Sequence, residues 1–183
     1  MDNQQERLEE QPLVIDLSWL AGVWESDGSF SLRSNNCRMK KKTYIQHAPL
    51  LQFVNTDPDI MLAVINILRR IQVGYYELWR LNEFNGGKKL KGELRISGIK
   101  RNQRLLTYLI PYLKGTKKKR AEVILEYCNE RLSKPKYAKY GEQEFEIINK
   151  WQATQNEIKN IFLKSSETNT PNIGKMKIES ELY

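Results

Sequence analysis

Hydrophobic residues recur at two different periods along the first third of the chain, and the change of period separates a helix from two strands. Apolar residues recur every three or four positions over residues 13–27, which predicts a helix that ends in a left-handed residue at Gly28. Alternation then predicts strands over Ser29–Arg33 and Tyr44–Val54, with a polar loop over residues 35–42 between them. Pro49 indicates that the second strand has an edge or a bulge.

The pattern continues with further helices and one more pair of strands. Asn55–Pro58 is a helix-start signal, and a helix to about Arg70 would face inward with Met61, Val64, Ile65 and Leu68. A hairpin is expected over residues 73–82 and 88–97, followed by helices over 102–113, 117–132 and 142–163.

The order αββαββα, followed by further helices, predicts an α+β fold with one antiparallel sheet and helices packed on one of its faces. The other face must then meet water or a ligand. We expect a flexible lead over residues 1–12, one domain over 13–163 and a polar tail over 164–183.

Composition restricts the chemistry that the chain can perform. The net charge is +8, and the first 16 residues are acidic, so the remainder is strongly basic and suited to a polyanion. His47 is the only histidine, which excludes a zinc site of the Cys/His type and leaves carboxylates, lysines and an oxygen-binding metal such as Mg²⁺. Cys37 and Cys128 indicate a reducing intracellular compartment rather than a disulfide framework, and no apolar stretch is long enough to span a membrane.

The first helix ends in an unusual combination of residues. Asp27 places a negative charge at the helix C-terminus, where the macrodipole disfavours it. Ser18, Gly22 and Ser26, with Ala21 beside them, form a ridge of small side chains that allows another helix to approach closely. Two such helices in contact would bring two carboxylates together, and cations would have to lie between them. That arrangement suits metal-dependent phosphodiester cleavage, although Asp27 before Gly28, taken alone, is more typical of a simple turn.

These residues resemble the LAGLIDADG homing endonuclease family. The run Leu20-Ala-Gly-Val-Trp-Glu-Ser-Asp-Gly28 matches the namesake motif, with Glu25 in place of its first acid. The segments 55–58, 71–75 and 111–121 are also similar to the family, so the resemblance covers about residues 13–163. The chain contains one copy of the motif.

The resemblance implies a saddle-shaped sheet that binds double-stranded DNA in the major groove, and a motif helix that forms the interface of a homodimer. It implies a double-strand break in a long pseudo-palindromic target, leaving short 3′ overhangs. Mg²⁺ would be the cofactor, with Mn²⁺ or Ca²⁺ able to replace it for binding, and Asp27 with Gly28 would form the metal site. Lys119, or next Lys118, would support the attacking water, and Asn55 would approach the active site unless it only caps the following helix.

DNA contacts are expected from the polar face of the sheet. In the third strand the family register favours Tyr75, Glu77 and Trp79, whereas polarity favours Arg80 and Asn82. Arg and Gln suit base reading, while the basic loop suits phosphate. The expected set is Ser29, Ser31, Arg33, Arg38, Lys40, Lys41, Lys42, Tyr44, Gln46, Gln52, Tyr75, Glu77, Trp79, Arg80, Glu93, Arg95 and Ser97.

Two other functions suit the same fold. One is a DNA-binding protein that does not cut, for which Asp27 and a nearby lysine would be unnecessary. The other is an RNA maturase that assists intron splicing, because a basic sheet suits either polymer.

Overall fold

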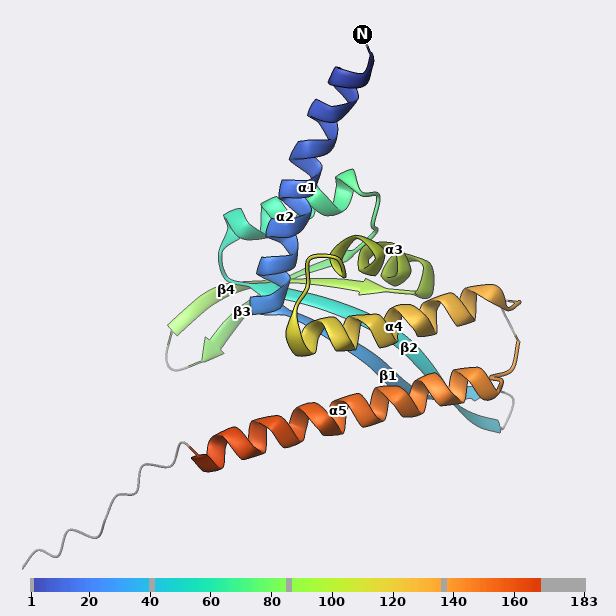
Figure 1. Ribbon diagram of the computed structural model, residues 1–183. Helices are drawn as coiled ribbons and strands as arrows, with labels where there is room; N and C mark the ends of the chain where they lie inside the picture. The colour runs from blue at the N-terminus through green and yellow to red at the C-terminus, as the bar shows by residue number, and fades with distance from the viewer. Residues whose placement is uncertain (1, 40–41, 85–86, 136–137, 169–183) are drawn as a thin grey trace, which may run out of the picture.

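A computed structural model of the chain describes residues 2–39, 42–84, 87–135 and 138–168. Its elements follow the order αββαββααα (Figure 1). They are α1 (Asp2–Asp27), β1 (Gly28–Met39), β2 (Lys42–Asn55), α2 (Pro58–Arg70), β3 (Tyr76–Phe84), β4 (Gly87–Ser97), α3 (Ile99–Leu109), α4 (Gly115–Ser133) and α5 (Glu142–Thr168). None of the helices described is both long and apolar enough to cross a membrane.

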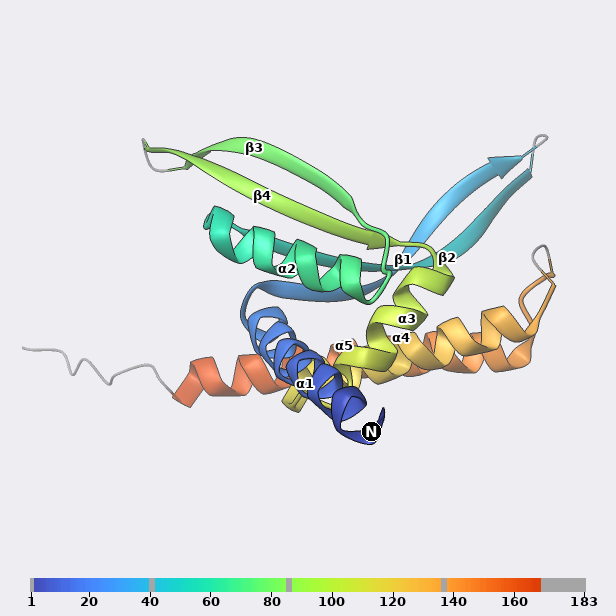
Figure 2. The same cartoon turned by 90° about the horizontal axis from the view of Figure 1, so that it is seen from above.

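The four strands form one antiparallel sheet in the order β1-β2-β4-β3. Figures 1 and 2 show the helices on one side of this sheet, which leaves the other side open. The predicted α+β class with helices on one face is therefore confirmed. We call the uncovered side the open face.

Alternating side chains from the strands form the core beneath the helices. Phe30, Phe53 and Leu94 are almost fully buried, and Trp24 of α1 packs on Phe53 with 5.4 Å between ring centroids. The second predicted helix is also confirmed, because Met61, Val64, Ile65 and Leu68 are buried on α2. The side chain of Asp57 caps this helix by accepting hydrogen bonds from the backbone N–H groups of the first turn.

The β1–β2 hairpin is longer than the sequence pattern predicts. The loop expected over residues 35–42 is wrong, because Asn35 pairs with Gln46 and Cys37 with Tyr44 in a continuous ladder. This distal arm lacks the apolar alternation used to identify strands, since its side chains are exposed on both faces. The β2–β4 ladder ends at Leu50, so Pro49 has no β4 partner. The predicted edge at Pro49 is therefore confirmed.

Three helices begin at different residues from those predicted. The first begins at Asp2 rather than residue 13, and its segment 2–12 extends beyond the body of the molecule in Figure 1. The helix expected from residue 102 begins at Ile99, because Gly98 with φ of 91° turns the chain directly out of β4. Asn102 is consequently buried in the first turn, where its amide donates to Gly98 O at 2.8 Å and Ile96 O at 3.1 Å. The helix expected from residue 117 begins at Gly115.

A buried acid joins α4 to α5. Glu144 accepts hydrogen bonds from Arg131, from Lys134 at 2.7 Å and from the backbone N–H of Gly141. Burial raises the pKa of Glu144, but the hydrogen bonds from Gly141, Lys134 and Arg131 outweigh it and hold the pKa below its usual value. The carboxylate is thus stabilised in its charged form inside the protein.

Substitution of Glu144 by Gln should lower the free energy of unfolding by about 3 kcal/mol at neutral pH, because it removes the buried charge that the partly buried Arg131 and Lys134 contact. A lowered pKa means that the contribution is complete above the usual carboxyl range and is lost as the pH falls through the lowered pKa. Urea unfolding at several pH values should therefore show the difference from wild type shrinking in acid.

The exposed neighbour Glu146 provides the control for this substitution. Glu146→Gln should change the free energy of unfolding by no more than about 0.5 kcal/mol. Equal effects of the two substitutions would show that the Glu144 network does not stabilise the fold.

Candidate active site and nucleic-acid interface

The C-terminus of α1 and the end of β2 meet at Asp27. Asn55 donates from Nδ2 to Asp27 Oδ2 at 2.9 Å, while its own Oδ1 accepts from the backbone N–H of Asp57 at 2.8 Å. Asn55 therefore lies beside the candidate acid, and the cap of α2 is Asp57. Asp27 is exposed, so the carboxylate remains accessible to a ligand.

Gly28 forms the direct junction between α1 and β1. It is the first residue of β1 and lacks a positive φ, so the left-handed helix end expected there is wrong. The reason for glycine is a close approach, since a Cβ at this position would lie 2.0 Å from Cδ1 of the buried Trp24 ring. Only a residue without a side chain allows the strand to begin against this ring.

Lys117 is the lysine that lies at this junction. Its Nζ donates to Gly28 O at 2.8 Å and to Trp24 O at 3.1 Å, and it also contacts Glu25 O. Desolvation lowers the pKa of Lys117, while the nearby charges of Asp27 and Glu25 oppose that shift. The ammonium thus binds the free carbonyl groups at the end of α1.

Of the two lysines predicted from the sequence, Lys119 is directed away from the junction. Lys119 forms an ion pair with Glu157 of α5 at 2.6 Å, so its side chain is turned to α5 rather than to the end of α1. The three lysines are consecutive in α4, at positions 117, 118 and 119. Successive side chains in a helix are rotated by about 100°, so they point in different directions. Of this run, Lys117 lies at the junction and Lys119 is directed to α5.

Oxygen atoms suited to a hard cation are present at the junction. Asp27 contributes a carboxylate, and Gly28 contributes a carbonyl that already accepts from Lys117. Within the described residues no group of three or more His, Cys, Asp or Glu side chains comes close enough to hold a metal.

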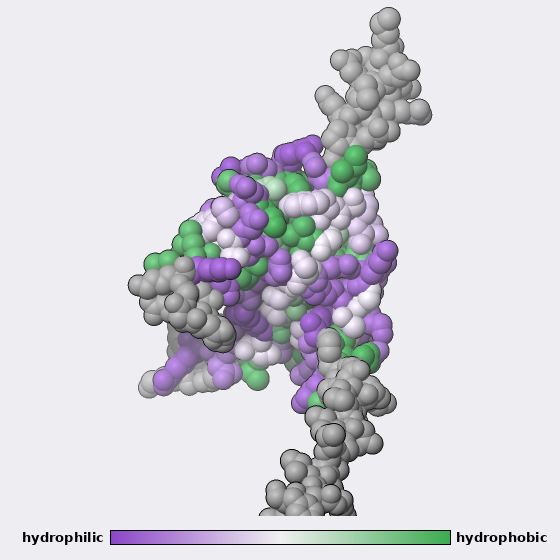
Figure 3. All heavy atoms as spheres, turned by 90° about the vertical axis from the view of Figure 1, so that its left-hand side faces the viewer, coloured by the Kyte–Doolittle hydropathy of each residue, from purple (hydrophilic) through white to green (hydrophobic). Residues whose placement is uncertain are grey.

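One face of α1 is exposed and lined with small residues. Ser18, Gly22 and Ser26 all lie on it, and nothing lies within 4 Å of where a Cβ on Gly22 would stand. Ala21 is fully buried in the subunit's own core, so its expected place at the interface is wrong. The exposed apolar side chains of Ile15 and Trp19 extend this face. Neither residue was predicted from the sequence. Figure 3 shows apolar surface near the point where α1 leaves the body of the molecule.

The open face is a polar surface made by all four strands. The register aligns Ser29, Gln52, Arg95 and Tyr76 in one row across the sheet. Hydrogen bonds join Arg33 to Gln52 at 2.8 Å, Gln52 to Glu93 at 2.6 Å and Arg95 to Glu93 at 2.6 Å. The register places these predicted contact residues together on the open face: Ser29, Ser31, Arg33, Tyr44, Gln46, Gln52, Arg80, Glu93, Arg95 and Ser97.

On the third strand, the residues that the family register favours do not lie on the open face; the alternate residues do. Glu77 pairs with Leu94 and Trp79 with Gly92, so both belong to the helix-covered side, and Tyr75 precedes β3 and packs against the core. Polarity gave the correct face, because Arg80 pairs with Lys91 on the open side. Tyr76 and Lys91 were not predicted: Tyr76 looks like a core residue, whereas Lys91 follows the same alternation as Glu93 and Arg95.

The structure describes only part of the basic segment at the far end of β1 and β2. Alternation places Arg38 on the opposite side from Cys37 and Tyr44, so it does not share the open face. Lys40 and Lys41 lie outside the described residues, and Lys42 begins β2.

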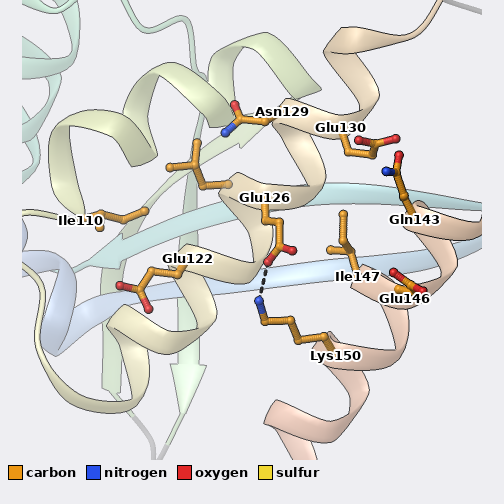
Figure 4. A pocket seen from close by; sticks show the side chains of 10 residues that line it. Ile110, Glu122, Glu126, Asn129, Glu130, Gln143, Glu146, Ile147 and Lys150 are labelled. Atoms are coloured by element: carbon orange, nitrogen blue, oxygen red, sulfur yellow. Dashed lines mark hydrogen bonds and ion pairs between the residues drawn. The ribbon is translucent and has the colours of Figure 1, made fainter.

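The helical side of the molecule carries an acidic groove. Glu122, Glu126 and Glu130 of α4 line it together with Glu146 and Lys150 of α5, and Lys150 pairs with Glu126 (Figure 4). An acidic groove repels a polyanion, whereas the open face combines Arg33, Arg80 and Arg95 with polar side chains. The two sides of the molecule thus differ in the partner that they favour.

Comparison with solved structures identifies the fold. The homing endonuclease I-CvuI, solved in complex with its target in the presence of Ca²⁺, is 18% identical, with a TM-score of 0.55 over 78% of this chain and 82% of that one. The LAGLIDADG homing endonuclease I-GzeII, in complex with a DNA target, is 14% identical with a TM-score of 0.52 over 75% of this chain. A double mutant of I-SmaMI is 15% identical with a TM-score of 0.53 over 76% of this chain.

The chain spans 43% of the length of I-GzeII and of I-SmaMI. No family model matches the sequence, and no curated protein matches it. The likeness to these structures shows that the chain has the fold of the LAGLIDADG homing endonucleases, as the motif at 20–28 predicts.

Proposed function

We propose that the chain is a LAGLIDADG homing endonuclease that acts as a homodimer and makes a site-specific double-strand break with short 3′ overhangs. The observation that carries this proposal is the structure of α1. One helix presents an exposed face of small residues and ends in an exposed acid, Asp27, that Asn55 contacts. A helix that brings two acids together by self-association needs both features.

The open face supports binding of double-stranded DNA. Its row of Ser29, Gln52 and Arg95 crosses three strands, and Arg and Gln side chains suit bidentate contacts to guanine and adenine in the major groove. I-CvuI and I-GzeII, which share the fold, were solved in complex with DNA targets. The acidic groove of Figure 4 lies on the helical side and disfavours DNA there.

The junction at Asp27 supports metal-dependent hydrolysis. Two Asp27 carboxylates from two subunits would hold Mg²⁺, with the Gly28 carbonyl oxygens at the same helix ends. When bound, the cation supplies an activated water and stabilises charge on the phosphate. Asn55 orients the Asp27 carboxylate, and Lys117 places a positive charge at the same junction. One subunit provides one acid, so cutting both strands requires the dimer.

Replacement of Asp27 by Asn should remove cleavage and leave DNA binding nearly intact. Loss of the metal site should lower the cleavage rate by roughly a thousandfold or more, since several kcal/mol of transition-state stabilisation corresponds to that factor. The measurement is cleavage, with Mg²⁺ and with Mn²⁺, of the uninterrupted form of the locus that encodes the chain, alongside affinity for the same DNA.

Asp59→Asn, at an exposed acid on α2, is the matched control and should cleave normally. If wild-type protein binds the locus but yields no product with either metal, the chain binds DNA without cutting it. If it binds the host intron RNA instead of this DNA, the maturase function is correct.

Replacement of Gly22 by Leu should weaken the dimer at least about tenfold, because the larger side chain separates two closely packed helices. The subunit itself should remain folded, since open space surrounds the position and leucine favours helix more than glycine does. Sedimentation equilibrium measures the dimer constant, with the exposed Asn149→Leu on α5 as the control. An unchanged dimer would place the interface elsewhere.

The two candidate lysines can be separated by paired substitutions. Lys117→Met should reduce the cleavage rate at least about tenfold with little change in DNA affinity, because it removes the charge nearest the junction. Lys119→Met should cleave like wild type, since Lys119 contacts Glu157. Thermal unfolding of both variants tests the alternative, because activity that falls only in proportion to the folded fraction would make Lys117 purely structural.

A further inference from the structure

A second groove lies beside the open face, where β4 ends and α3 begins. It has a volume of about 820 Å³, and Gln46, Ser97, Lys100, Arg101, Arg131 and Lys134 are among the residues that line it. Four of these side chains are basic, and none of the described residues that line the groove is acidic. It therefore has the opposite character to the acidic groove between α4 and α5.

Two of the four cations are already neutralised. Arg131 and Lys134 both contact Glu144, and Lys134 also contacts Glu130 at 2.6 Å. For Lys100 and Arg101, by contrast, the described part of the chain provides no ion pair or side-chain hydrogen bond. The free positive charge of the groove thus belongs to these two residues.

The position of Lys100 and Arg101 is unfavourable for the isolated subunit. They lie side by side in the first turn of α3, which contains no acid and which Gly98 precedes without a capping side chain. Positive charges at a helix N-terminus are repelled by the macrodipole, whereas an anion there is stabilised. The side chain of Arg101 also lies against Gly74, where a Cβ would stand 3.0 Å from Arg101 Nε. An anion in the groove would offset this repulsion.

The groove is continuous with the surface proposed to bind DNA. Gln46 and Ser97 belong to the open face, and the β2 residues that precede Leu50 have no β4 partner, so the groove opens along the free edge of that segment. A duplex lying on the open face presents its bases to the strands and its sugar-phosphate backbone to the flanks. The anion nearest this groove is therefore a DNA phosphate.

We infer that Lys100 and Arg101 form a phosphate-binding site at this groove and hold the backbone of the bound duplex beside the β1–β2 arm. The inference rests on the proposed function, because it takes the open face to bind duplex DNA. The site supplies affinity that is independent of sequence, and it lies away from Asp27, so it takes no part in cleavage chemistry.

The test uses the full chain and a short DNA duplex of arbitrary sequence. For the double variant K100Q/R101Q, the slope of log affinity against log salt should become shallower by about 1 to 2, since each phosphate contact contributes about 0.9. Its unfolding temperature should stay the same or rise, because the substitutions remove cations from a helix N-terminus. The matched control is the double variant R69Q/K159Q, which also removes one arginine and one lysine, at exposed positions on α2 and α5.

The outcomes separate the inference from the proposed function. If the two double variants change the slope equally, the effect is one of net charge and the phosphate site is wrong. If K100Q/R101Q loses affinity for a duplex RNA of the same sequence while DNA binding is unchanged, the assignment to DNA is wrong. If wild-type protein does not bind duplex DNA at any salt concentration, the proposed function itself fails, and the inference fails with it.

Discussion

The contact between the Trp24 ring and the backbone of Gly28 determines where the candidate acid lies. Because the ring occupies the place of a Cβ on Gly28, the chain passes from α1 into β1 without a loop. Asp27 is therefore held by a rigid helix on one side and a core strand on the other. Asn55 reaches it only because β2 pairs with β1 in the register that opposes Gly28 to Phe53. One packing contact thus links the core to the site.

The distribution of charge gives the molecule two different sides. The open face joins polar and basic residues through hydrogen bonds such as Arg33 to Gln52, and the groove at Lys100 and Arg101 continues it at one flank. The helical side carries the acidic groove and the buried Glu144 network. This arrangement would steer DNA to one side and leave α1 as a separate surface for the proposed self-association.

The order of helices and strands could be predicted because apolar periodicity records which side of each element is buried. The motif and the Asn55–Pro58 signal could also locate Asp27 and Asn55. Periodicity failed where burial is absent, as in the exposed β1–β2 arm. It also failed for Lys117, because three consecutive lysines give no indication of which one faces the end of α1. Ala21 looked like an interface residue but is small because the subunit's own core surrounds it.

We propose that two Asp27 carboxylates share bound cations across a homodimer. A crystal structure of the chain with DNA from its uninterrupted locus and Ca²⁺ tests this most directly. We predict cation density within about 2.3–2.6 Å of an Asp27 oxygen from each subunit, the usual range for Ca²⁺ and oxygen. Cations bound elsewhere on the DNA, or Asp27 residues separated by an interface that excludes α1, would contradict it.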